Sequence, residues 1–470
     1  MCLRIGLYYL KGGILNKTWQ KNYKLKNKMT FLLKSHQVIA VVNKIVIVIF
    51  GLVIALLITA KLTPEQQGLH FLFQSLIGFS ALAEMGVIYS VIQLTSKAVG
   101  LSSMRREDNR RMVGGRYLFF TIKWFVLTSI VLVLILGPFG HYWILSGRGF
   151  SYSNIRPYIG FWYALVFSNS ITLLGNGILG FLEGYGDISG ANFCRLITNS
   201  FYHCTIAFSM YCGYEAKSIV FGSCIGNIAL LFLLYFKYGK QMTTLFRLAI
   251  IYKLQVNWSK EIKPFQTKIS ISWLSGFISN QVTLPLIYRY LGSVDAGRIG
   301  LSLQLCSVLN GVSIAWPLAS ASKLARAFAL KNYLTRQNIF NADVKVSTTI
   351  FAILAVLLLL SIKIAFALNI FSADRVVSLG IITFILIPGA LAAHLNNSMA
   401  IYIRSTGIEP LTYCSVVTSL VAFLLNLYCI PNYGHLGAVL PNAIVSILIC
   451  LPWIYLHYKK DFYLYPAEKM

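Results

Sequence analysis

Charged residues are scarce in this chain. Asp, Glu, Lys and Arg together make up only 12% of the 470 residues, about half of the roughly 25% that is typical of soluble domains. Hydrophobic types make up 57%. A soluble protein of this length could not cover its surface with so few charges, whereas a protein that faces lipid does not need to. The composition therefore predicts an integral membrane protein.

Motifs of enzymes and of cofactor sites are missing as well. The sequence contains no P-loop, no GxSxG, no HExxH and no CxxC, so it offers no nucleotide cradle, nucleophile elbow or zinc site. The segments between the apolar stretches are short. We therefore expect no enzyme activity, no cofactor and no metal site. A membrane glycosyltransferase or glycan polymerase, which would need a large outward loop, is a less favoured alternative.

The nine cysteines follow no pattern. All except Cys2 lie in apolar stretches, which indicates free, buried thiols and not disulfides or metal ligands. Residues 1–37 are basic and show no small-residue cleavage site before the first long apolar run, so no cleavable signal peptide is expected. Met29 is an alternative start of the chain.

Long apolar runs are what the sequence has in abundance. A helix needs about 20 mostly apolar residues to cross the hydrocarbon core of a bilayer. The runs predict an all-α integral membrane fold of about twelve transmembrane helices. The predicted spans are residues 38–60, 69–94, 117–137, 158–182, 193–213, 217–236, 268–290, 299–321, 347–371, 377–401, 412–430 and 434–456.

Basic residues alternate around these spans. The sequence has 41 Lys and Arg against 14 Asp and Glu, a net charge of +27. Thirty of the basic residues lie in or at the border of the two termini and every second loop, and only eight lie on the opposite side. This asymmetry predicts that both termini are cytoplasmic. It also accounts for the basic excess without a nucleic-acid partner.

The longest internal loop is basic and divides the predicted spans six and six. We therefore predict two six-helix lobes around a central cavity. The predicted boundaries are a cytoplasmic N-terminus (1–37), an N-lobe (38–236), a cytoplasmic linker (237–267), a C-lobe (268–456) and a cytoplasmic tail (457–470).

Three pairs of loops indicate that the two lobes are repeats. Leu62–Gly68 after the first span and Leu291–Gly297 after the seventh both run from Leu to Gly with an acid between them. Two further pairs of Gly-containing loops occur in order, and the three offsets are about 229, 221 and 219 residues. Repeats of six spans share one orientation, which predicts a pseudo-twofold axis along the membrane normal and a cavity between the lobes.

Polar residues within the spans are the candidates for a binding site, because a charge at the bilayer centre costs about 2.5–3.5 kcal/mol and usually faces a cavity or a partner. Lys44 lies in the first span beside Asn43, Lys123 in the third, and Arg289 ends the seventh near Asn280. We predict a basic cavity lined by these residues, suited to an anionic, hydroxyl-rich substrate. The alternatives are that Lys123 and Arg289 extend to the headgroups and that single Asn side chains join helices.

Glu84 in the second span is the candidate for ion coupling. The alternative is that it forms a structural ion pair with Lys44.

Prolines within spans of the second half predict bent helices, because proline removes a backbone hydrogen bond. Bent spans around a cavity favour alternating access. These prolines are Pro285, Pro317, Pro388 and Pro441.

Several stretches resemble a known family. Leu62–Phe73, Glu84–Gly86 and Leu182–Gly186 resemble parts of polysaccharide flippases. Tyr288–Ser302, followed by Ala315–Trp316, is similar to the second-lobe signature of Wzx-type O-antigen flippases. These are lipid-linked oligosaccharide flippases of the multidrug/oligosaccharidyl-lipid/polysaccharide (MOP) exporter superfamily. The order of the motifs extends the resemblance over nearly the whole chain.

This resemblance implies a two-lobed, MATE-like fold. It implies that the protein flips undecaprenyl-pyrophosphate-linked oligosaccharide repeat units across the bacterial inner membrane, for O-antigen, lipopolysaccharide or other surface polysaccharide. An ion gradient would drive the transport. The implied partners are the lipid-linked oligosaccharide, membrane lipids, and polysaccharide polymerase and chain-length machinery. A multidrug antiporter of the same superfamily is the alternative, but it would favour acidic residues in the first or seventh span, and those spans hold none.

Overall fold

The computed structural model describes residues 36–84, 86–103, 107–147, 152–368, 373–406 and 410–464. Within these ranges the regular elements are all helices, which confirms the predicted fold class. Most of the predicted N-terminal segment, with Cys2 and Met29, lies outside the described residues, as do Met85 and the last residues of the predicted tail.

The first half of the chain forms one group of helices, and short breaks divide several of them. The elements are α2 (His36–Lys61), α3 (Pro64–Gly78), α4 (Ser80–Glu84), α5 (Val87–Ser103), α6 (Glu107–Leu145), α7 (Tyr152–Tyr185), α8 (Ile188–Tyr211), η1 (Glu215–Lys217), α9 (Ser218–Leu233), η2 (Leu234–Tyr238) and α10 (Gly239–Ile251).

The second half is built in the same way. Its elements are η3 (Trp258–Ile262), α11 (Lys263–Gln281), α12 (Thr283–Tyr290), α13 (Ser293–Ser313), α14 (Ala315–Ala329), α15 (Tyr333–Ala367), η4 (Ala373–Arg375), α16 (Leu379–Ile381), η5 (Ile382–Leu386), α17 (Ile387–Arg404), α18 (Thr412–Ile444), η6 (Val445–Cys450) and α19 (Leu451–Leu464).

Many of these helices can cross a membrane. In the described residues, eight are long and apolar enough, or nine if the bent pair Pro64–Glu84 and Val87–Leu101 counts as one span. The chain is therefore a multi-span membrane protein. The more polar helices α8 and α11 are not among the eight.

The longest of the eight, Thr412–Lys460, is two helices joined by a turn. Gly434 interrupts it with φ 57° and ψ −128°. A Cβ on Gly437 would lie only 1.9 Å from the carbonyl oxygen of Cys429, whereas residues eight apart in a straight helix are about 12 Å apart. The chain therefore turns back on itself here. With this turn, and with α8 and the α11–α12 pair included, the helices correspond to the predicted spans.

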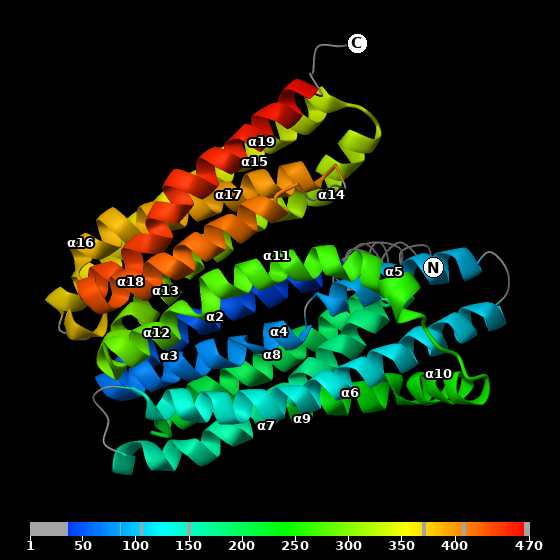
Figure 1. The fold of residues 1–470 in the computed structure, drawn as a ribbon, viewed down its shortest axis with the longest axis horizontal. Helices are drawn as coiled ribbons and strands as arrows, with labels where there is room; N and C mark the ends of the chain where they lie inside the picture. Colours follow the sequence, from blue (N-terminus) through cyan, green and yellow to red (C-terminus); the bar gives the residue numbers. More distant parts are fainter. Residues whose placement is uncertain are drawn as a thin grey trace, which may run out of the picture.

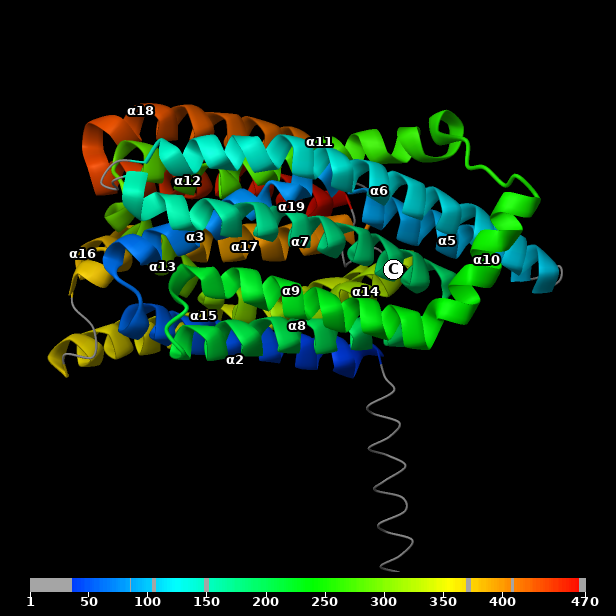
Figure 2. The ribbon, with the colours of Figure 1, turned by 90° about the horizontal axis from the view of Figure 1, so that it is seen from below.

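The helices lie in two groups (Figure 1). The N-lobe comprises α2–α10 and the C-lobe α12–α19, while α11 contacts α18 of the C-lobe and α3–α5 of the N-lobe. We call the end at which α2 begins and α19 ends the terminal end, and the opposite end, at which α12 is followed by α13, the distal end (Figures 1 and 2). The lobes meet at the distal end and diverge toward the terminal end. The residue boundaries of the predicted lobes and linker stay predictions.

At the distal end α3 and α13 cross closely because glycines face the crossing. A Cβ on Gly68 would lie 1.8 Å from the carbonyl oxygen of Ser293, and one on Gly297 would lie 3.1 Å from that of Pro64. Small residues allow membrane helices to approach this closely. Ser293 follows Pro64 by about 229 residues, and Gly297 follows Gly68 by the same number. This is the offset of the first loop pair, so each of the two contacts repeats the other with the lobes exchanged. The reciprocal contact supports a pseudo-twofold axis between α3 and α13.

Hydrogen bonds add to this distal contact. Gln67 is 1% exposed and donates from Nε2 to the carbonyl oxygens of Gly297, at 2.8 Å, and Arg375, at 2.9 Å. The start of α3 is fixed locally, because Thr63 and Gln66 form a capping box around its first turn. The sequence thus places an amide donor of the N-lobe directly against backbone acceptors of the C-lobe.

Much of the predicted linker is helical. α10 continues the sixth span over Gly239–Ile251 and packs on α6. Farther along, Trp258 stacks on Trp124 with ring centroids 4.6 Å apart, and Arg116 forms an ion pair with Glu261. These contacts hold the connection between the lobes against α6 of the N-lobe.

Candidate functional site

One face of α2 changes from buried to open along its length. Lys44, Gly51, Ala55, Ile58 and Leu62 share this face by their helical spacing. Toward the distal end it is closed, since Ala55, Ile58 and Leu62 are 6%, 0% and 2% exposed. Toward the terminal end Lys44 is exposed, and no atom lies within 4 Å of a Cβ built on Gly51. This face of α2, the helix that contacts α13 of the C-lobe, is therefore closed at the distal end and open at the terminal end.

This difference predicts a pattern of chemical labelling. In a variant whose native cysteines are replaced, a cysteine at Gly51 should react with a membrane-impermeant thiol reagent roughly tenfold faster than a cysteine at Ala55, because reactivity follows exposure. Labelling of right-side-out and inside-out vesicles measures both rates and shows which side the opening faces. Equal rates at the two positions would contradict the described opening.

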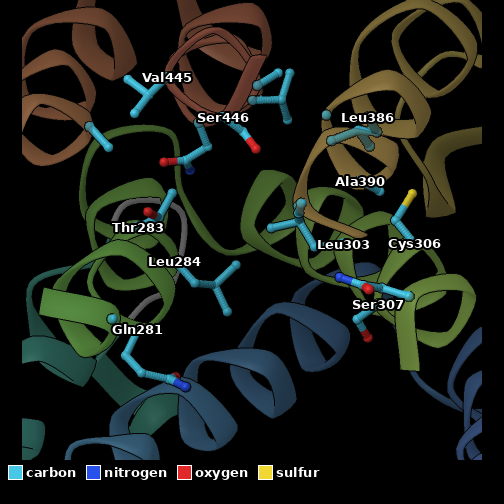
Figure 3. Close-up of a pocket in the computed structure, with 18 of the residues that line it drawn as sticks. Gln281, Thr283, Leu284, Leu303, Cys306, Ser307, Leu386, Ala390, Val445 and Ser446 are labelled. Atoms are coloured by element: carbon cyan, nitrogen blue, oxygen red, sulfur yellow. The ribbon is translucent and has the colours of Figure 1, made fainter. Parts of the chain in front are cut away.

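A cavity of about 780 Å³ lies between the C-lobe and α3. Its walls come from α11–α13, η5, α17, α18 and η6, with one side formed by Phe71, Gln74 and Ser75 of α3. In Figure 3, side chains of several of these elements surround a common space. The labelled ones are Gln281, Thr283, Leu284, Leu303, Cys306, Ser307, Leu386, Ala390, Val445 and Ser446.

The cavity has many polar lining groups but, among the described residues, no charged ones. Its lining, in the part of the chain that the structure describes, includes no Asp, Glu, Lys, Arg or His. Its polar groups are amides and hydroxyls, and most belong to the C-lobe. The amides on the walls formed by α11 and the C-lobe are Gln281, Gln304, Asn310, Asn396, Asn397 and Asn442. Such a surface can donate and accept hydrogen bonds but has no group that could neutralise a charged ligand.

The structure separates Lys44 from Asn43. Lys44 is exposed on the α2 face that opens toward the terminal end. Asn43 points to α8 instead, where Nδ2 of Asn199 donates to its Oδ1 at 3.0 Å. About two turns farther along α2 and one turn farther along α8, Phe50 stacks on His203. Asn43 thus takes the alternative role of joining helices, whereas Lys44 faces the open space without lining the C-lobe cavity.

Lys123 lies on the outer surface of α6. It is exposed and shares its helix face with Leu127, Ile130 and Leu134, which are 57%, 53% and 68% exposed. Large apolar side chains exposed along a spanning helix face lipid. This position agrees with the alternative in which the lysine extends to the headgroups. Lys123 is not part of the cavity lining.

Arg289 lies in the last turn of α12 at the distal end and is exposed. Its guanidinium lies over the ring of Trp143 on α6, 5.5 Å from the centroid, so it joins the two lobes where they already meet. The side chain of Asn280 lies outside the described residues. Arg289 is not part of the cavity lining.

Glu84 ends α4 at the break between α4 and α5 and is half-buried. Arg195 of α8 is the charge that acts on its carboxylate, and Arg195 forms an ion pair with Glu183 of α7. In the described residues no ion pair joins Glu84 to Lys44. Arg195 therefore pairs with Glu183 and also acts electrostatically on Glu84, inside the N-lobe and apart from the C-lobe cavity.

The site residues predicted from the sequence are mostly charged, and they do not include the residues described in the cavity lining. A signal for them exists in the spacing. Gln304, Ser307 and Asn310 recur every third residue on α13, and Asn396 and Asn397 lie on α17. Polar residues at helical spacing in a span form a stripe on one face, and these stripes face the same cavity.

Comparison with known proteins establishes the fold. No protein-family model and no curated protein sequence matches the chain. Among solved structures, an inward-facing multidrug resistance MATE family transporter of the MOP superfamily is similar, with a TM-score of 0.65 and 14% identity over 90% of this chain and 98% of that one. The chain has the fold of MOP-superfamily transporters.

Two further solved structures agree with this MOP fold. An outward-facing MATE family transporter of the superfamily gives a TM-score of 0.54 at 14% identity over 91% of this chain and 97% of that one. The lipid II flippase MurJ, in an inward closed conformation, gives 0.59 at 16% identity over 91% of this chain and 90% of that one. The predicted MATE-like fold is confirmed.

Proposed function

We propose that this protein flips lipid-linked oligosaccharides across a membrane by alternating access. The observation that carries the proposal is the cavity of about 780 Å³ between the lobes, with its uncharged lining of amides and hydroxyls. Sugar hydroxyls both donate and accept hydrogen bonds, and such a lining matches them. A fold shared with a lipid II flippase is consistent with this substrate class.

The specific substrate that we propose is the undecaprenyl-pyrophosphate-linked repeat unit of O-antigen or another surface polysaccharide. The likeness of Tyr288–Ser302 to the Wzx signature supports it. We place the protein in the bacterial inner membrane with the terminal end in the cytoplasm, because the loops at that end carry most of the basic residues. Polymerase and chain-length machinery would then act on its product.

Export of cationic drugs, the alternative within the superfamily, has less support. A cationic drug in a membrane cavity needs a carboxylate to offset its charge. The described lining of the cavity has none, and two half-buried acids of the N-lobe, Glu84 and Glu183, lie under the influence of the cation Arg195. Glu84 stays our proposed site of ion coupling, because its carboxylate is half-buried and burial favours the uncharged, protonated form of a carboxyl group.

Deletion of the gene in its own bacterium tests the proposed function. The lipid-linked repeat unit should accumulate on the cytoplasmic leaflet, and surface polysaccharide should fall by about tenfold or more, because spontaneous flipping would have to desolvate a charged, hydroxyl-rich headgroup. Sided labelling of the glycan in intact cells and in inside-out vesicles measures its distribution, with the complemented strain as the control. A lipid-linked glycan that reaches the outer leaflet normally would rule out the flippase function.

A further inference from the structure

Three amides in the described cavity wall have a side-chain carbonyl oxygen without a hydrogen-bond donor. Among the described residues, no donor reaches Oε1 of Gln304, Oδ1 of Asn310 or Oδ1 of Asn396, and Asn396 is only 6% exposed. A carbonyl oxygen held away from water without a donor is unfavourable, and a bilayer supplies no donor in place of water. Nδ2 of Asn396 donates to the carbonyl and hydroxyl oxygens of Ser446, both at 3.4 Å, but its Oδ1 remains available. These three oxygens can therefore accept from a ligand that offers donors.

The wall also supplies donors and further acceptors. Ser307 and Asn397 are exposed in it, and Asn442 and Ser446 are half-buried. Hydroxyl groups donate and accept, and each amide presents one donor group and one acceptor. A ligand that carries several hydroxyls on one face can therefore satisfy both kinds of group at once.

The described cavity wall has no group that could offset a charge on a ligand. Its described lining has neither a cation nor an anion. The carboxylate of a uronic acid, or the ammonium of an amino sugar with a free amine, would enter a low-dielectric site without an opposite charge. Burial of such an unpaired charge is strongly unfavourable, whereas an uncharged hexose or N-acetylhexosamine brings no charge and finds amides and hydroxyls among the lining residues.

We propose that the C-lobe cavity receives the sugars of the translocated unit and selects uncharged ones, an inference that rests on the proposed function. The cavity volume of about 780 Å³ lies within the roughly 300–1,000 Å³ of small-ligand pockets, which is room for sugars but not for a polyprenyl chain. The pyrophosphate stays outside, in the opening between the lobes, where Lys44 is exposed. In this arrangement the charged part of the substrate lies outside the C-lobe cavity, and the uncharged sugars lie within it.

The composition of the accumulated glycan tests this selection. Lipid-linked oligosaccharide from the deletion strain is extracted, its sugars are released by mild acid, and their masses are measured. The expected result is a repeat unit of uncharged sugars only. A uronic acid or a free amino sugar in the unit would overturn the inference and leave the flippase function standing. If no lipid-linked glycan accumulates, the proposed function fails, and the inference fails with it.

Isosteric charge variants test the cavity itself. Asn397→Asp adds a carboxylate to an exposed lining residue and should lower surface polysaccharide about tenfold at an unchanged protein level, because the new charge has no partner in the wall. Asn396→Asp should act in the same direction. The matched control is Asn432→Asp in the exposed distal turn, which should export normally. Normal export by Asn397→Asp would overturn the assignment, even if Asn396→Asp fails to fold.

Discussion

Gly68→Ala is expected to lower surface polysaccharide about tenfold or more while the protein remains in the membrane. The added methyl carbon would lie 1.8 Å from the carbonyl oxygen of Ser293, so α3 and α13 cannot keep their present separation. Overpacking of this kind costs roughly 1–3 kcal/mol. Because each 1.4 kcal/mol is tenfold in an equilibrium constant, the distal-closed state would lose most of its population.

The same variant should move the opening from one side to the other. A cysteine at Ala55, which is 6% exposed, should become reactive from the distal side in the Gly68→Ala background. The matched control is Gly160→Ala on α7, where a Cβ meets no atom within 4 Å; an alanine there should change neither export nor labelling. Gly297→Ala should act like Gly68→Ala, since the two contacts are reciprocal. Normal export by Gly68→Ala would show that the tight crossing is dispensable.

The fold could be predicted largely from the sequence, because its determinants are local or periodic. Apolar length marks the spans and the alternation of basic loops orders them. The prolines also predict where spans break. Pro285 and Pro317 cannot donate to the carbonyls four residues earlier, and those residues, Gln281 and Ser313, are the last of α11 and α13. The helix α10 was not predicted, because its stability depends on packing against α6.

The site was harder to predict, because the sequence of a span shows which residues are charged but not whether their side chains face a cavity or the lipid. Lys123 illustrates this limit. Its charge is visible in the sequence, but its direction follows from the large apolar residues at helical spacing on the same face, Leu127, Ile130 and Leu134. Neutral amides in one span are individually ambiguous. Only the packing of α13 against α17 and α18 brings Gln304, Asn396 and their neighbours to one cavity.

Ser307→Trp is expected to lower export about tenfold or more without loss of protein from the membrane. Ser307 is exposed in the cavity wall, and its hydroxyl only donates to the carbonyl oxygen of Gln304 on its own helix, at 2.7 Å. Its removal therefore breaks no contact between helices. An indole at this position would occupy much of the cavity and take the place of the sugars, and ligands are lost when their pocket is filled.

A matched substitution separates obstruction from damage to the fold. Ser361 on α15 is also exposed and also bonds only to its own helix, where its hydroxyl donates to the carbonyl oxygen of Leu357. It is not part of the cavity lining, so Ser361→Trp should export normally. Surface polysaccharide and membrane protein level are measured for both variants in the complemented deletion strain. If Ser307→Trp exports as well as Ser361→Trp, the substrate does not pass through the C-lobe cavity, and the route must lie along the N-lobe side of the opening where Lys44 is exposed.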